Sequence, residues 1–231
     1  MSDSIISIRD LTVELGGNPV LRDMTLTVSQ GEIVAVVGPN GTGKSTLLRC
    51  LAGLQPGGSG EIRVFGEPPS DDAGFWSRVA LLTDEPAWYP GLTAREHLEL
   101  MAAVHAPPRI EPRMEPRMEP RLEPRLEPRL EPRMEVDAAL ETFSLVERAD
   151  AAPLNLSTGQ RQRLALAAAL LRPSALLLLD EPERGLDAGF RERLTGLLVA
   201  YTNEGGTVVM ATHDPGLAAR ARQVSPSGVA A

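Results

Sequence analysis

The sequence predicts an α/β fold with a largely parallel sheet, an N-terminal antiparallel β subdomain and an inserted helical subdomain. Three continuous apolar runs, at residues 32–38, 175–180 and 206–214, are typical of strands buried on both faces of a parallel sheet. Helical patterns at residues 156–171 and 187–203 lie between these runs. Strands that alternate with helices in this way indicate an α/β domain with a parallel core.

The first part of the chain predicts the antiparallel subdomain. The segments SIRDLTVEL (residues 7–15) and MTLTV (residues 24–28) alternate apolar with polar residues, as half-buried strands do. We therefore expect residues 5–37 to form β structure, which includes the first buried strand.

A glycine-rich segment follows that strand and precedes a helical pattern. GPNGTGKST, at residues 38–46, matches the phosphate-binding pattern G-x-x-x-x-G-K-[ST] of a P-loop NTPase core. Its backbone N–H groups and the start of the helix suit phosphate oxygens. We expect Lys44 to reach the β- and γ-phosphates, Ser45 to coordinate Mg²⁺ and Thr46 to contact the α-phosphate. The predicted nucleotide-binding residues are Gly38, Pro39, Asn40, Gly41, Thr42, Gly43, Lys44, Ser45 and Thr46. The alternative is a plain strand-to-helix turn with an incidental lysine.

The helical subdomain is predicted at residues 93–156. Residues 93–104 and 136–149 each show helical spacing, and they flank six copies of Glu-Pro-Arg-Met/Leu at residues 111–134. Proline at every fourth residue forbids a regular α-helix, because each proline removes a backbone donor and clashes with the preceding turn. We interpret the repeat as a low-complexity insertion. An arm that binds a partner remains the alternative.

The second half of the predicted site follows the strand of four leucines. Asp180 and Glu181 stand at the carboxyl end of that strand, where ligand sites of α/β proteins lie. Asp180 is expected to hold Mg²⁺ through water, and Glu181 to act as the general base for the attacking water. Taken alone, two acids after a strand are also typical of a helix N-cap.

Residues 155–187, NLSTGQRQRLALAAALLRPSALLLLDEPERGLD, resemble the signature and Walker B segments of ABC-type ATPases. The resemblance runs from the first strand to about His213, and five motifs occur in the family's order. LSTGQ matches the family's LSGGQ, with Thr158 in place of one glycine. The resemblance implies that Ser157, Gly159 and Gln160 meet the γ-phosphate of ATP held by the opposite subunit, so it implies a homodimer with two composite sites. An N-cap role for Ser157 is compatible with this.

Two further positions take their roles from the resemblance. Asp187 ends GLD, which matches the loop that bridges the two sites across the family's dimer. His213 matches the switch histidine that contacts the γ-phosphate. A histidine at a strand end is otherwise an ordinary surface residue.

The sequence also departs from the family. The aromatic residue that stacks on adenine is missing, and Leu15 is the nearest candidate for contact with the base. Asp84 stands at the position of the Q-loop glutamine, where its carboxylate could hold Mg²⁺ or water. An acid there, followed by Glu-Pro and LTAREHL, resembles the ATPases of ABC-2-type exporters. The short segment after His213 keeps the haem-exporter ATPases of cytochrome c maturation open as well.

Composition bounds the function of this single domain of 231 residues. The net charge is −8 and no Lys/Arg-rich patch is present, so we expect no nucleic-acid partner. Cys50 is the only cysteine, which excludes an internal disulfide. The first residues do not read as a secretory signal, and Arg172 and Pro173 interrupt the longest apolar stretch. We therefore expect a soluble chain at the cytoplasmic face of the cell membrane.

The sequence thus predicts an ATP-hydrolysing subunit, with Mg²⁺ as cofactor, that drives an exporter. Its partner would be a membrane-spanning subunit on a separate chain. Trp88 and Tyr89 are candidates for that contact, with local packing as the alternative. Two other classes stay open: a soluble ABC-type ATPase that acts on ribosomes or DNA, and a regulatory subunit that binds ATP without turnover.

Overall fold

The parallel sheet forms the centre of the molecule. The computed structural model describes residues 4–56, 58–105 and 134–226. Five strands pair in the order β5-β6-β7-β3-β8, and every pair is parallel. The strands are β3 (Ile33–Val36), β5 (Val79–Leu82), β6 (Leu176–Asp180), β7 (Thr207–Ala211) and β8 (Arg222–Val224). Because the strands are parallel, their carboxyl ends meet at one edge of the sheet.

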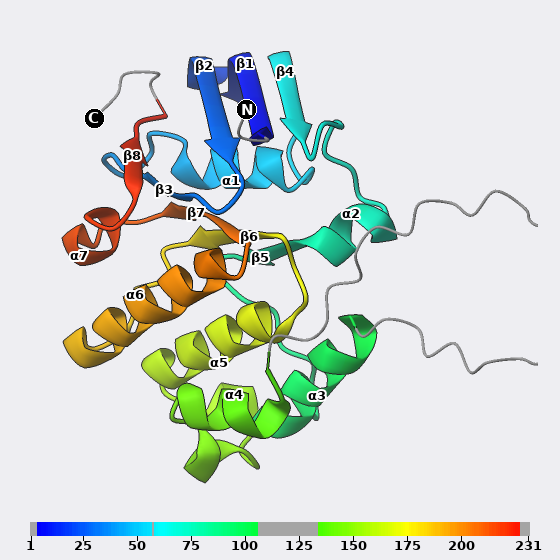
Figure 1. Ribbon diagram of the computed structural model, residues 1–231, viewed down its shortest axis with the longest axis vertical. Helices are drawn as coiled ribbons and strands as arrows, with labels where there is room; N and C mark the ends of the chain where they lie inside the picture. Colours follow the sequence, from blue (N-terminus) through cyan, green and yellow to red (C-terminus); the bar gives the residue numbers. More distant parts are fainter. Residues whose placement is uncertain (1–3, 57, 106–133, 227–231) are drawn as a thin grey trace, which may run out of the picture.

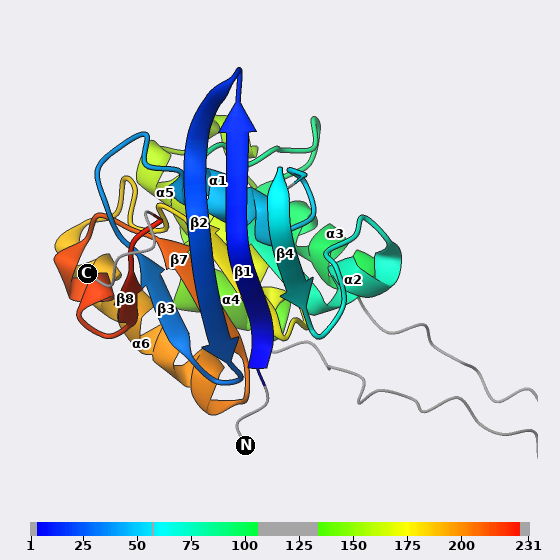
Figure 2. The ribbon, with the colours of Figure 1, turned by 90° about the horizontal axis from the view of Figure 1, so that it is seen from above.

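The antiparallel sheet lies above the parallel one in Figure 1. It consists of β1 (Ser4–Leu15), β2 (Asn18–Ser29) and β4 (Ser59–Val64), in the order β2-β1-β4. Gly16 and Gly17 have φ values of 58° and 78° and close a two-residue hairpin between β1 and β2, seen as a long ribbon in Figure 2. The predicted antiparallel subdomain is confirmed, whereas the sequence reading had not identified β4.

Alternate residues of the central strands face two separate apolar clusters. Leu177 and Leu179 of β6 pack with α5 (Thr158–Leu171) and α6 (Ala188–Asn203) on one face. Leu176 and Leu178 pack with α1 (Lys44–Leu51) and the antiparallel sheet on the other. The continuous leucine run therefore reflects burial on both faces, as predicted. The layers follow in Figure 1 from the antiparallel sheet through α1 and the parallel sheet to α5 and α6.

The remaining elements are short, apart from α3. They are α2 (Ala73–Arg78), α3 (Ala94–His105), α4 (Val136–Thr142), α7 (Pro215–Ala218) and the 3₁₀ helices η1 (Val146–Arg148) and η2 (Pro153–Asn155). β8 is the one short strand that the structure places after α7, at the edge beside β3. In the part of the chain that the structure describes, no helix has the length and apolar character needed to span a bilayer.

The prediction of one helix over residues 136–149 is wrong. α4 ends at Thr142, and Ser144 adopts a left-handed backbone with φ of 53°. The N–H of Leu145 then donates to the carbonyl of Leu140 at 2.8 Å, which closes the helix end. This turn brings Leu145 into the core, where it is fully buried. Burial of that side chain therefore overrides the helical spacing.

The inserted helical subdomain at 93–156 remains a prediction. Its helices α3 and α4 pack on α5, and their buried side chains join the same cluster as the parallel sheet. Most of the repeat predicted at 111–134 lies outside the described residues.

Candidate nucleotide site

The loop after β3 wraps around the side chain of Lys44. The ammonium of Lys44 donates to the carbonyl oxygens of Gly38 and Pro39, both at 2.9 Å, and the side chain is buried. The hydroxyl of Thr42 donates to the Pro39 carbonyl at 2.9 Å. These bonds hold the loop in a closed curve around a single positive charge.

Gly43 lets this curve pass close to the antiparallel sheet. Its φ is 94°, and a Cβ there would lie 2.7 Å from Leu21 Cδ2 and 2.8 Å from the Val20 carbonyl oxygen. α1 begins directly after it without a side-chain cap. The N–H groups of the first turn are thus left for another acceptor, which suits an anionic phosphate.

Asp180 lies at the carboxyl end of β6 with its carboxyl group buried. Burial raises the pKa of Asp180, and the hydrogen bond with Ser45 acts in the opposite direction. The nearby carboxylates of Asp84 and Glu181 raise that pKa further, whereas Arg49 lowers it. The net effect is a carboxyl group whose negative charge is poorly compensated.

The pairing of Asp180 with Ser45 fits a Mg²⁺ ion. A carboxylate and a hydroxyl are hard oxygen ligands, and a cation would relieve the repulsion among the three acids. Within residues 4–56, 58–105 and 134–226, no group of three His, Cys, Asp or Glu side chains could hold a metal. An ion at this position would therefore take its other ligands from water and from phosphate, as Mg²⁺ commonly does.

Glu181 adopts a strained backbone conformation. Its φ is 48°, a left-handed value that residues other than glycine rarely adopt. Its N–H donates to the Ala211 carbonyl at 2.9 Å, and its own carbonyl accepts from Gln162 Nε2 at 3.3 Å. The side chain reaches His213, with 3.7 Å between Glu181 Oε1 and His213 Nε2. Both side chains are partly exposed, so this pair is open to a ligand.

The signature segment forms a capping box at the start of α5. The hydroxyl oxygen of Ser157 accepts from the Gln160 N–H at 3.2 Å, and Gln160 Oε1 accepts from the Ser157 N–H at 2.9 Å. The N-cap interpretation of Ser157 is therefore confirmed. A Cβ on Gly159 would lie 2.5 Å from the Gly185 carbonyl oxygen, so this helix start lies against the loop that leads to α6.

Asp187 ends that loop and caps α6. Its carboxylate accepts from the Phe190 N–H at 2.8 Å. Among the described residues, no hydrogen bond or ion pair joins Ser157, Gln160 or Asp187 to the Lys44 loop. The structure thus collects Lys44, Ser45, Asp180, Glu181 and His213 at one sheet edge, and leaves the signature segment outside that group.

The other predicted contacts lie at the surface. Leu15 is 41% exposed at the end of the β1–β2 hairpin. Asp84 is exposed after β5, 4.0 Å from Arg49, and its carbonyl accepts from Arg184 at 3.5 Å. This places an acid near Asp180 without direct contact.

Trp88 and Tyr89 flank His97 in different ways. Trp88 is partly buried, with its ring 5.1 Å from the His97 ring, whereas Tyr89 is 53% exposed. His97 is buried, its Nδ1 finds no hydrogen-bond partner in the described parts of the chain, and burial lowers its pKa. Local packing therefore accounts for Trp88, while Tyr89 remains available to a partner.

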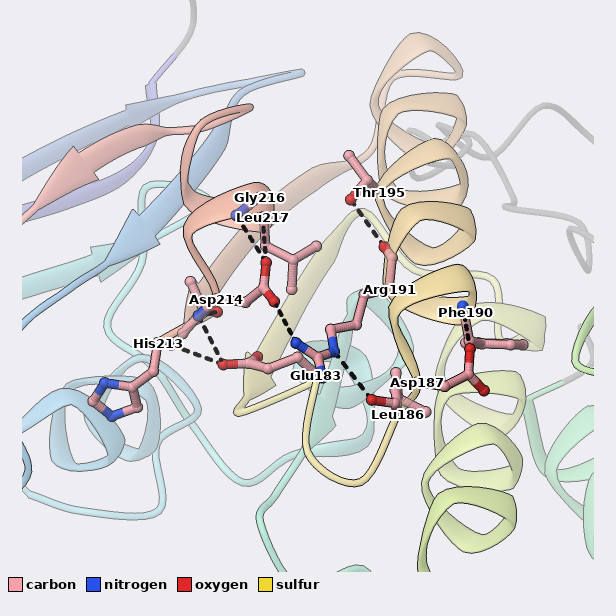
Figure 3. A network of polar contacts seen from close by, with 11 residues as sticks. Glu183, Leu186, Asp187, Phe190, Arg191, Thr195, His213, Asp214, Gly216 and Leu217 are labelled. Carbon is pink, nitrogen blue, oxygen red and sulfur yellow. Dashed lines mark hydrogen bonds and ion pairs between the residues drawn. The ribbon is translucent and has the colours of Figure 1, made fainter.

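Sequence reasoning missed two residues of this site. Gln162 Nε2 donates to the carbonyls of Glu181 and Pro182, at 3.3 and 3.1 Å. Glu183 Oε1 accepts from the backbone N–H of His213 at 2.8 Å (Figure 3). The only signal in the sequence was an acid just after Asp-Glu-Pro, and it carries no information about a partner thirty residues away.

Comparisons with known proteins agree with this geometry. A family model described as "ABC transporter" matches residues 21–184. The SkfA peptide export ATP-binding protein SkfE of Bacillus subtilis is 35% identical over 190 residues, covering 82% of this chain and 71% of that protein. The cytochrome c biogenesis ATP-binding export protein CcmA of Bordetella bronchiseptica is 36% identical over 214 residues, or 92% and 84% of the two chains.

A solved structure shares the fold. It is the dimeric, post-hydrolysis state of the ATP-binding cassette MJ0796 bound to ADP and Pi. The TM-score is 0.76 at 26% identity, with 95% of this chain and 93% of that chain covered.

Proposed function

The chain belongs to the ABC transporter family as an ATP-binding subunit with ATPase activity, and we propose that it drives an exporter. The observation that supports the ATPase site is the convergence of the Lys44 loop, the Ser45–Asp180 pair and the Glu181–His213 pair at one sheet edge. The similarity to SkfE and CcmA, which are both export ATP-binding proteins, supports the direction of transport.

Nucleotide binding rests on the loop after β3. Lys44 would exchange its bonds with the loop carbonyls for charge-assisted bonds to the β- and γ-phosphates. The free N–H groups at the start of α1 would hold the remaining phosphate oxygens. Ser45 and Asp180 would hold Mg²⁺, which supplies positive charge against the phosphate oxygens when it is bound. Leu15 would touch the base through apolar contact alone.

Hydrolysis rests on Glu181 and His213. The oxygen of water attacks the γ-phosphorus, the bond to the β–γ bridging oxygen breaks, and ADP leaves. Glu181 accepts the proton that the attacking water loses, and His213 lies 3.7 Å away to contact the γ-phosphate. The left-handed backbone at Glu181 turns the carboxylate out of the strand toward His213.

A second copy of the chain would complete each site. Ser157 already accepts a bond inside its capping box, but its O–H still has a proton to donate to the partner's γ-phosphate. The backbone N–H of Gly159 and the amide hydrogens of Gln160 are the other donors at this helix start. Asp187 would bridge the two copies from the loop beside Gly159. The dimeric state of MJ0796 supports this arrangement.

Coupling to transport would take place at the cytoplasmic face of the membrane. The partner is a membrane-spanning subunit on another chain, and the exposed loop with Asp84 and Tyr89 is the proposed contact. No nucleic-acid partner is proposed, because the net charge of −8 opposes binding to the polyanionic backbone of a nucleic acid.

Phosphate release from ATP by the purified chain tests the enzymatic part. We expect turnover that requires Mg²⁺ and that Lys44→Ala abolishes through weakened nucleotide binding. Binding of ATP without phosphate release would instead support the regulatory subunit. Retention on DNA in a salt series would support the non-transport ATPase.

A further inference from the structure

The Glu183 carboxylate joins two loops that leave neighbouring strands. Glu183 follows β6, and its Oε1 accepts from the N–H groups of His213 and Asp214, at 2.8 and 3.2 Å. Figure 3 shows the carboxylate at the backbone of these residues, with the imidazole of His213 pointing away from it. Two consecutive N–H groups bound to one charged oxygen fix the path of the backbone, because both bonds must bend if the loop turns.

The carboxylate of Asp214, within the same loop, makes further hydrogen bonds. Asp214 Oδ2 accepts from Arg191 Nη1 at 3.1 Å, and its Oδ1 accepts from the N–H groups of Gly216 and Leu217. Arg191 Nε also donates to the Leu186 carbonyl at 3.0 Å. Desolvation acts to raise the pKa of Asp214, but these hydrogen bonds outweigh it and the pKa is lowered.

The other oxygen of Glu183 shows that this arrangement has a cost. Its Oε2 is buried and has no hydrogen-bond partner within the described residues. A desolvated carboxylate oxygen opposes folding unless other bonds compensate. The two charge-assisted bonds at Oε1 provide that compensation, so the side chain stays where it is because of its contact with residues 213 and 214.

We propose that Glu183 is a positioning residue for ATP hydrolysis, acting through His213. By holding the backbone of His213, it sets the 3.7 Å separation between the His213 imidazole and the Glu181 carboxylate. The inference rests on the proposed roles of Glu181 and His213. Within the described residues, no hydrogen bond or ion pair joins Glu183 to the Lys44 loop, so its removal should affect turnover and leave ATP binding by Lys44 in place.

Three variants test this role. Glu183→Met removes the acceptor at similar side-chain volume, Glu183→Gln keeps an acceptor oxygen, and Glu192→Met is the matched control on the exposed side of α6. We expect Glu183→Met to lower kcat about tenfold or more, since misplacement of about 1 Å costs up to about a hundredfold. Its KM for ATP should change less than about threefold. Glu183→Gln should retain most of the activity, and Glu192→Met should match the parent.

A double-mutant cycle separates positioning from general destabilisation. Glu183→Met should cause no further loss of kcat in a His213→Ala background. An equal loss in both backgrounds, or a parent-like kcat in the single variant, would overturn the proposal. If Glu183→Met does not fold, Glu183→Asp takes its place, because its carboxylate is too short to reach the loop. Parent-like turnover by Glu183→Asp would likewise overturn the proposal.

Amide hydrogen exchange gives a readout that does not depend on activity. Glu183→Met should speed exchange at the His213 amide while the strands keep their protection. The Asp214 amide should change less, because it also donates to Thr212 Oγ1 at 3.0 Å. Unchanged exchange at the His213 amide would overturn the positioning role alone. A parent protein that binds ATP but releases no phosphate would overturn the proposed function instead. The contact between Glu183 and the His213 backbone would then have no role in catalysis.

Discussion

Glu181 stands in a backbone conformation that costs about 1–3 kcal/mol for a residue other than glycine. The structure maintains it through the Ala211 carbonyl on one side and Gln162 on the other. This conformation directs the Glu181 carboxylate away from the strand, at the sheet edge where Lys44 and Asp180 lie. Strain at this residue is therefore consistent with a role that depends on position.

Glu181→Gln is expected to bind ATP, lose turnover and accumulate as an ATP-bound dimer. The amide keeps the shape of the side chain but cannot accept the proton of water, and a general base contributes about 10²–10⁴ in rate. Phosphate release and size-exclusion chromatography with ATP are the measurements, with Glu192→Gln as the control. Turnover within about threefold of the parent would remove Glu181 from the role.

The buried thiol of Cys50 should make the free energy of unfolding depend on pH. It is 1% exposed on α1, and burial raises its pKa from 9.0 to about 11. Between these values the unfolded chain loses the thiol proton and the folded chain keeps it, so the free energy of unfolding must fall as pH rises. The parent should therefore lose up to about 2–3 kcal/mol more than Cys50→Ala over this range, at about 1.4 kcal/mol per pKa unit.

Urea unfolding at several pH values from 8 to about 11 measures this difference. Cys50→Ala leaves a small cavity and lowers stability at every pH, but a cavity does not titrate, so the slopes remain comparable. Equal slopes for the two proteins would show that the thiol ionises as readily in the folded chain as in the unfolded one.

At the scale of residues, local motifs and distant partners differ in what a sequence reveals. The backbone path from Gly38 to Thr46 depends on neighbours in the chain, so its pattern predicts a phosphate-binding loop. Glu183 and Gln162 act on backbone groups nineteen to thirty-one residues away. No local spacing encodes such a contact, so only the fold brings those partners together.

At the scale of elements, the start of α5 and the loop before α6 fit closely together. Gly159 lies against the Gly185 carbonyl, and the Thr158 side chain lies 3.1 Å from where a Cβ on Gly185 would stand. Thr158 is the residue that departs from the family's LSGGQ. Its methyl group therefore packs onto the loop that ends at Asp187, and the two proposed dimer contacts are placed side by side in one chain.

Gly159→Ala and Gly196→Ala should have opposite effects on stability. Both glycines lie in helices, but the new methyl group would clash with Gly185 in the first case and meet nothing within 4 Å in the second. We expect Gly196→Ala to raise the free energy of unfolding by about 0.4–1 kcal/mol through helix propensity. Gly159→Ala should lower it by about 1–3 kcal/mol, since the contact involves backbone on both sides.

Urea or thermal unfolding of both variants checks the stability, and ATPase rates check the site. Gly159→Ala is also expected to lower turnover, because the displaced loop carries Asp187. A Gly159→Ala protein as stable as Gly196→Ala would show that the loop shifts at no cost.

Element boundaries were predictable where periodicity and packing agree. The strand of leucines, β6, was predicted correctly because every side chain in it is buried. The prediction of one helix at 136–149 was wrong because Leu145 reaches the core only through a left-handed turn at Ser144. β4 was missed because its residues are mostly exposed or half-buried and show no strong alternation.

At the scale of the whole molecule, α3 and α4 are tied to the core by their own side chains. Leu98 of α3 and Phe143, the residue directly after α4, are fully buried, and the Phe143 ring lies 5.8 Å from that of Phe190 on α6. Arg95 of α3 forms a 2.6 Å ion pair with Asp137 of α4. The two helices are thus placed by contacts between described residues, independently of the segment that joins them in sequence.

The strand order lies beyond what the sequence could predict. The pattern of runs and helices indicated a parallel sheet, but it did not say that β3 lies between β7 and β8. That order depends on long-range pairing, such as Val34 with Val209. The rule that ligand sites lie at the carboxyl ends of parallel strands supplied the expectation for Asp180 and Glu181, and the family resemblance supplied it for His213.

Deletion of five of the six Glu-Pro-Arg-Met/Leu copies is expected to leave fold, ATP binding and basal hydrolysis nearly intact. The repeat has no period that buries an apolar face, and α3 and α4 hold their places through Leu98, Phe143 and the Arg95–Asp137 pair. Loop-closure entropy changes by only about 0.6 kcal/mol per doubling of length, so shortening should be neutral or slightly stabilising.

A matched control replaces the five copies by a Gly/Ser segment of equal length, which separates the effect of length from the effect of composition. Melting curves and ATPase rates of the three proteins decide the question. A melting temperature more than about 5 °C below the parent in both variants, worth over about 1 kcal/mol in a chain of this size, would mean that the repeat packs on the domain and contributes to its stability.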